Sequence, residues 1–156
     1  GMSARIATPS AKGTWLETDK SSEVLAADNV HTTAADYARF LQGIIRGEGV
    51  SPALRAEQTR VQSDRRLELC RKVEAKLCPK GAGFGLGWEA YVFEDTTVLM
   101  HTGNDRGESA MAVVDLGRGD ALVVLTNSNN GISVAADLLE KVGLEPRFVD
   151  FLLHSQ

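Results

Sequence analysis

The sequence predicts one α+β domain in which helices pack against an antiparallel sheet of about four strands. Apolar residues recur at helical spacing before residue 62, alternate with a period of two between residues 84 and 127, and return to helical spacing after residue 132. The links between the alternating segments are short, which favours antiparallel neighbours. The 156 residues, of which 43% are hydrophobic, are enough to form one domain with its own core.

Two helices are expected in the first half of the chain. The first covers residues 34–46, because Thr33 and Asp36 have the spacing of a capping box and Gly47 follows as a natural stop. Its apolar side chains repeat at i, i+3, i+4, i+7 and i+8, which places them on one face. The second covers residues 52–62 and begins with a Ser-Pro pair, which suits a helix N-terminus.

The second half of the chain predicts the sheet and two closing helices. Residues 102–107 are expected to form a polar loop between strands. The last strand is almost continuously apolar, which is typical of a strand covered on both faces. The four strands are expected over residues 84–93, 97–101, 109–116 and 121–127, and the two helices over residues 132–142 and 146–153.

Residues 63–80 contain both cysteines, Cys70 and Cys78. Apolar residues step by four here, which favours a helix: Leu69, Val73 and Leu77. A helix would place the two cysteines about 12 Å apart along its axis, whereas a disulfide needs Cα atoms within about 7 Å of each other. A bridge therefore requires a bent or non-helical segment, and two free thiols are favoured. No metal site is expected, because no histidine or second cysteine pair lies at ligand spacing.

Charge and hydropathy argue against a nucleic-acid partner and against a membrane span. The formal net charge of −4 leaves no basic excess for nucleic-acid binding. No apolar run approaches the roughly 20 residues of a membrane span.

The N-terminus lacks the charged start and apolar stretch of a signal peptide. The protein is expected to be soluble, and both a periplasmic and a cytoplasmic location stay open. Residues 1–25 are expected to form a polar segment ahead of a domain over residues 26–156, and Gly1, ahead of Met2, is interpreted as a remnant of a removed tag.

Three short motifs have the residue types of functional sites. The glycines of residues 81–87 precede a strand rather than a helix, which argues against a phosphate-binding loop. Residues 128–130 read Ser-Asn-Asn, but their place between a strand and a helix favours turn and cap chemistry. The most informative motif is His101, Thr102 and Gly103, at the end of a predicted strand and next to a polar loop.

Four segments in order resemble the C-terminal part of the serine β-lactamase and penicillin-binding-protein-like hydrolases, closest to class C-like esterases. These segments are residues 26–41, residues 83–89 (Gly-Phe-Gly-Leu-Gly-Trp-Glu), residues 101–107 (His-Thr-Gly-Asn-Asp-Arg-Gly) and residues 121–131. The resemblance implies that His101, Thr102 and Gly103 border an active site whose strand backbone helps bind an acyl carbonyl. It implies a small acyl substrate, namely a β-lactam, an ester or a D-amino-acid peptide, and no cofactor.

The sequence departs from this family at the nucleophile. It contains no Ser-x-x-Lys, and its nearest match, residues 63–66, ends in Arg66, which stays protonated and cannot act as a base. The chain is therefore expected to be a C-terminal domain or fragment that is inactive alone. A non-catalytic binding or protein-interaction module is the alternative, and chance similarity of an unrelated α+β protein also stays open.

The missing half of the family fold has a consequence for the last strand. Without neighbouring N-terminal strands, residues 121–127 would form an apolar sheet edge, and such edges pair, aggregate or are covered. Residues 1–25, a second copy in a homodimer or a separate partner chain are expected to cover it.

Overall fold

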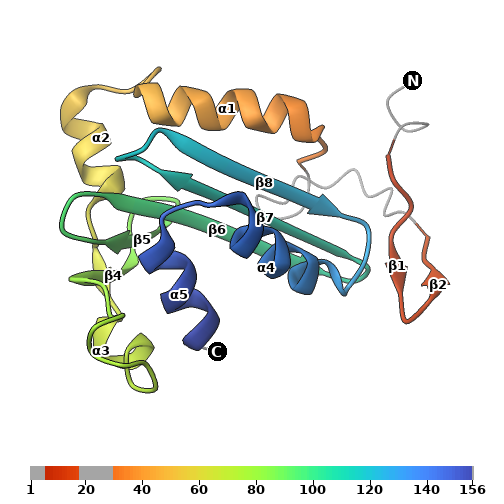
Figure 1. The fold of residues 1–156 in the computed structure, drawn as a ribbon. Coiled ribbons are helices and arrows are strands. Elements are labelled where there is room, and N and C mark those ends of the chain that lie inside the picture. Colours follow the sequence, from red (N-terminus) through yellow and green to blue (C-terminus); the bar gives the residue numbers. More distant parts are fainter. Residues whose placement is uncertain (1–5, 18–29, 156) are drawn as a thin grey trace.

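The structure is a computed structural model that describes residues 6–17 and 30–155. Its centre is an antiparallel six-stranded sheet whose strands lie side by side in chain order. Helix α1 covers one face of this sheet, and α4 and α5 cover the other (Figure 1). The strands are β3 (Ser63–Asp64), β4 (Gly81–Phe84), β5 (Glu89–Val92), β6 (Thr97–Asp105), β7 (Glu108–Asp115) and β8 (Asp120–Thr126).

The helices confirm the α+β class. They are α1 (Ala34–Arg46), α2 (Pro52–Thr59), α3 (Arg66–Leu69), α4 (Gly131–Val142) and α5 (Pro146–His154). Helix α1 has the predicted bounds, because the Thr33 hydroxyl accepts the Asp36 N–H and Gly47 adopts a left-handed conformation with φ 69°. None of the helices within the described residues has the length and apolar character of a membrane span.

The sheet has six strands rather than about four, and the largest error concerns residues 84–93. This predicted single strand is interrupted at residues 85–88, where the Gly85 N–H bonds the Trp88 carbonyl at 2.7 Å, so β4 and β5 form a hairpin. Residues 102–105 were expected in a loop but extend β6, because they pair with residues 108–111 of β7. The bounds of the other predicted elements differ less from the observed ones. Helix α2 ends at Thr59 instead of residue 62, and the remaining strands and helices other than α1 differ by one residue at one or both ends.

Two hydrophobic clusters lie on opposite faces of the sheet. On one face, α5 packs Phe148 and Phe151 against Tyr91 of β5, with ring centroids 5.1 and 5.7 Å apart. On the other face, Leu41 of α1 packs with Leu99 of β6 and further strand residues. Because side chains alternate between faces along each strand, both faces of the central strands are buried. This agrees with the continuous apolar run of β7, whereas in β8, which was expected to be covered on both faces, only Val124 is buried and Leu125 is exposed.

The two cysteines form a disulfide, which corrects the expected free thiols. The bond joins Cys70 and Cys78, whose Cα atoms are 5.8 Å apart. Residues 63–80 are not one helix: α3 ends at Leu69, and turns follow, with the Val73 N–H bonded to the Cys70 carbonyl and the Leu77 N–H to the Glu74 carbonyl. The chain therefore bends back on itself, which is the condition under which the sequence allows a bridge.

Strand β8 is the last strand of the sheet, and only its C-terminal end is contacted by the described part of the N-terminal segment. The Ser10 N–H bonds the Asn127 carbonyl at 2.9 Å, and the Asn127 side-chain amide bonds the Thr8 carbonyl at 2.8 Å. Beyond Ser10, strands β1 (Ser10–Ala11) and β2 (Thr14–Trp15) form a small hairpin. The expected domain boundary at residues 25 and 26 lies outside the described residues.

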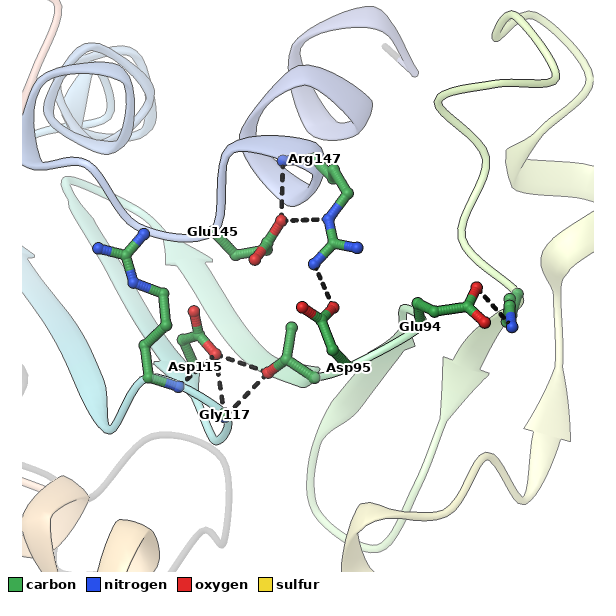
Figure 2. A network of polar contacts seen from close by, with 9 residues as sticks. Glu94, Asp95, Asp115, Gly117, Glu145 and Arg147 are labelled. Carbon is green, nitrogen blue, oxygen red and sulfur yellow. Dashed lines mark hydrogen bonds and ion pairs between the residues drawn. The ribbon is translucent and has the colours of Figure 1, made fainter.

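A polar network joins the start of α5 to two turns of the sheet (Figure 2). Arg147 bonds Glu145, which is buried, and reaches across to Asp95 in the turn between β5 and β6. These hydrogen bonds to the Arg147 guanidinium lower the pKa of both carboxyl groups below their ordinary values. In the neighbouring turn after β7, one oxygen of the buried Asp115 accepts hydrogen bonds from the Thr96 hydroxyl and from the Gly117 N–H.

Replacing Arg147 with methionine is expected to remove an acid-sensitive part of the stability. A carboxyl whose pKa is lowered by folding stabilises the protein above its ordinary pKa, here 3.8 for Asp95 and 4.5 for Glu145. That contribution is lost as the pH falls through the lowered value. Urea unfolding at neutral pH should therefore show a less stable variant, and the difference should shrink at about pH 2–3. A difference that is the same at both pH values would contradict this interpretation.

Candidate functional site

The predicted site residues His101, Thr102 and Gly103 lie inside β6, at the point where its neighbour β5 ends. The last pair between β5 and β6 joins Glu89 to Met100. On its other side, β6 pairs with β7 as far as Asp105. No strand of the described residues continues β5 beside residues 101–105, and Figure 1 shows the long β6 running past the short β5. We call this unpaired side of residues 101–105 the open edge.

The ladder pattern shows which backbone groups face the open edge. In an antiparallel sheet, alternate residues direct both their N–H and their C=O to the same neighbour. The Leu116 N–H bonds the Thr97 carbonyl at 3.1 Å, so Thr97 faces β7 and Met100 faces β5. By the same alternation, Thr102 and Asn104 direct their N–H and C=O groups to the open edge. Asn104 was not among the predicted site residues, because the resemblance assigns roles only to His101, Thr102 and Gly103.

The side chains of the motif point to opposite faces of the sheet. His101 is exposed on the face that α1 covers, where its ring meets the buried Trp88 edge to face, with centroids 6.3 Å apart. Thr102, half-buried, is on the opposite face, which it shares with Met100. Gly103 is exposed and has no atom within 4 Å of the position that a Cβ would occupy. The backbone at the open edge is therefore not crowded at Gly103.

The region of the open edge combines unpaired backbone groups with an exposed imidazole, that of His101. Backbone N–H groups fixed in a strand can stabilise a developing oxyanion, because they need no reorganisation during a reaction. The ring nitrogens of the exposed His101 side chain can donate or accept a hydrogen bond. In the described part of the chain, no serine hydroxyl is hydrogen-bonded to a lysine or a histidine. Nor do three acidic, histidine or cysteine side chains among these residues gather at a metal-binding distance.

Comparison with known families decides between the resemblance and chance similarity. A sequence model of the family described as Beta-lactamase matches residues 2–144. The chain belongs to the Beta-lactamase family. No curated protein and no solved structure matches it. The match confirms the predicted membership and shows that this β-lactamase-family domain has a fold related to that of serine hydrolases. It also includes all three residues of the predicted motif.

Proposed function

We propose that this β-lactamase-family chain provides the strand-edge half of a serine hydrolase site for β-lactams, esters or D-amino-acid peptides. The observation that carries the proposal is the open edge of β6, where the predicted motif lies beside unpaired backbone groups. In this proposal, the N–H groups of Thr102 and Asn104 bind the acyl carbonyl or the polar end of the substrate. His101 takes part in proton transfer, and Gly103 leaves room for the ligand.

We propose further that residues 1–156 are inactive alone. Acyl transfer by a serine hydrolase needs a nucleophile with a neighbouring base, and the sequence has no Ser-x-x-Lys. Asp64 and Arg65 separate Ser63 from Arg66, which donates to the Pro79 carbonyl at 2.7 Å and cannot accept a proton. The nucleophile must then come from outside these residues.

A second candidate function is that of a protein-interaction module, and the edge strand β8 favours it. Within the described residues, β8 pairs only with β7, and the N-terminal segment reaches no further than residues 127–129. Residues 121–126 contain no charge and no proline, which are the usual protections of an edge strand. A partner chain or a second copy that adds a strand here would leave the open edge of β6 accessible.

Ligand titration of the ¹⁵N-labelled chain tests the proposed half-site. With a penicillin, a short ester or an acylated D-alanyl peptide, the amide signals of Thr102 and Asn104 should shift, while hydrolysis and covalent labelling by a fluorescent penicillin stay absent. His101→Ala should weaken the response, and the matched control His154→Ala, an exposed histidine at the end of α5, should not. Shifts confined to other residues would overturn the half-site. Covalent labelling of the chain would overturn its inactivity.

A further inference from the structure

The tip of the β6–β7 hairpin extends beyond both neighbouring strands. Pairing with β5 stops at Met100, and pairing of β7 with β8 stops at Ser109 opposite Thr126. Residues 104–108 therefore lack a strand on either side. A two-stranded hairpin is only marginally stable in water without other support. Because Asn104 lies in this segment, the geometry of the open edge depends on what holds the tip.

Asn129, in the loop before α4, holds the tip with both ends of one side-chain amide. Its Nδ2 donates to the Asp105 carbonyl at 3.1 Å, and its Oδ1 accepts the Gly107 N–H at 3.2 Å. The two bonded groups lie on either side of Arg106, so one planar amide fixes the turn from both sides. The Asn129 N–H in turn bonds the Ser10 carbonyl at 3.3 Å, which ties this loop to the N-terminal segment.

Two serines complete the support of the tip. The Ser109 hydroxyl is within hydrogen-bond distance of Asn104 Oδ1 and the Ser128 carbonyl, at 3.0 Å each. The Ser10 N–H lies 3.1 Å from the Gly107 carbonyl. Gly107 has φ +85°, and a Cβ there would lie 2.8 Å from Leu16 and 2.9 Å from the Ser10 nitrogen. The turn is therefore closely packed against the N-terminal segment.

We infer that Asn129 is a positioning residue for the open edge of β6. Its two hydrogen bonds hold Asp105 and Gly107 in a part of the hairpin that has no strand on either side, and thereby fix the turn that follows Asn104. The functional meaning of this inference rests on the proposed half-site, whereas the conformational effect does not. Ligand affinity at the open edge is then set partly by a residue that lies on the α4 side of the hairpin and touches no ligand.

Amide exchange in the full chain tests this role with Asn129→Ala and the matched control Asn130→Ala. Asn130 lies in the same exposed loop, and its side chain takes part in none of the hydrogen bonds within the described residues; its N–H, which the substitution keeps, bonds the Ser128 hydroxyl oxygen. In Asn129→Ala, the Gly107 amide should exchange roughly tenfold faster, which corresponds to the loss of one hydrogen bond. The amide signals of Thr102 and Asn104 should shift, penicillin should bind more weakly, and the midpoint of thermal unfolding should match that of the control.

Asn129→Asp separates the two hydrogen bonds. It keeps an acceptor for the Gly107 N–H but loses the donor to the Asp105 carbonyl, so Gly107 should stay protected while the Asn104 signal still moves. Equal amide spectra at Thr102 and Asn104 in both alanine variants would overturn the inference. So would a loss of protection throughout the chain, since it would indicate a global role. Wild-type chain that binds no ligand, with the amide effects present, would instead reject only the proposed half-site.

Discussion

Replacing Phe148 with alanine is expected to lower the free energy of unfolding by about 3–5 kcal/mol. The Phe148 ring is fully buried, at 0% exposure, and packs on Tyr91 with ring centroids 5.1 Å apart. Truncation removes apolar burial and leaves a cavity between α5 and the sheet, which close packing prevents from collapsing completely. Since a domain of this size is stable by only about 5–15 kcal/mol, the variant should be close to unfolding at ambient temperature.

Phe40→Ala provides the matched control for this change. Phe40 of α1 is 50% exposed, so its loss should cost roughly 1 kcal/mol or less. Denaturant unfolding of both variants measures the difference. A similar loss in the two would mean that the α5 cluster is not the main core of the domain.

Replacing Asp115 with alanine is expected to cost about 2–3 kcal/mol, because it removes a buried acceptor. Asp115 is fully buried, and its Oδ1 accepts from the Thr96 hydroxyl at 2.6 Å and from the N–H groups of Gly117 and Arg118 at 3.1 and 3.2 Å. The carboxyl therefore joins the turn before β6 to the turn after β7. Its other oxygen, Oδ2, has no hydrogen-bond partner in the described part of the chain.

Asp115→Asn tests whether the acceptor or the charge is important. The amide keeps an oxygen for all three donors, so thermal unfolding should show a smaller loss than in Asp115→Ala. Equal losses in the two variants would mean that the negative charge, rather than the Oδ1 hydrogen bonds, provides the stabilisation.

Helices α1, α2, α4 and α5 could be predicted from the sequence because their signals are local. Thr33, Asp36 and Gly47 fix both ends of α1, and the apolar spacing fixes its buried face. The break between β4 and β5 could not be predicted, since Phe84, Leu86 and Trp88 keep alternating across it. The break is made by the backbone turn at residues 85–88, whose glycines allow it without changing the apolar pattern.

The sequence allowed a prediction of the residues of the candidate site, but not of the strand edge on which they lie. His101, Thr102 and Gly103 carry a recognisable motif, yet the open edge depends on where β5 stops, which is a property of pairing between strands. Polar residues 102–105 resemble a loop in sequence and become a strand only because β7 lies opposite them. The disulfide was not predicted for a related reason. The apolar residues keep helical spacing through the segment, so the sequence does not indicate the bend that brings Cys70 and Cys78 together.

The same disulfide changes what a protease would release from the chain. Its closed loop contains three trypsin-type cleavage positions, after Arg71, Lys72 and Lys76, all of them exposed. A cut at any of them leaves both pieces joined through sulfur, so the nicked chain keeps its apparent size until a reductant is added. The stretch between the two cysteines, which was expected to be helical, is thus a loop in which backbone cleavage and fragment release are separate events.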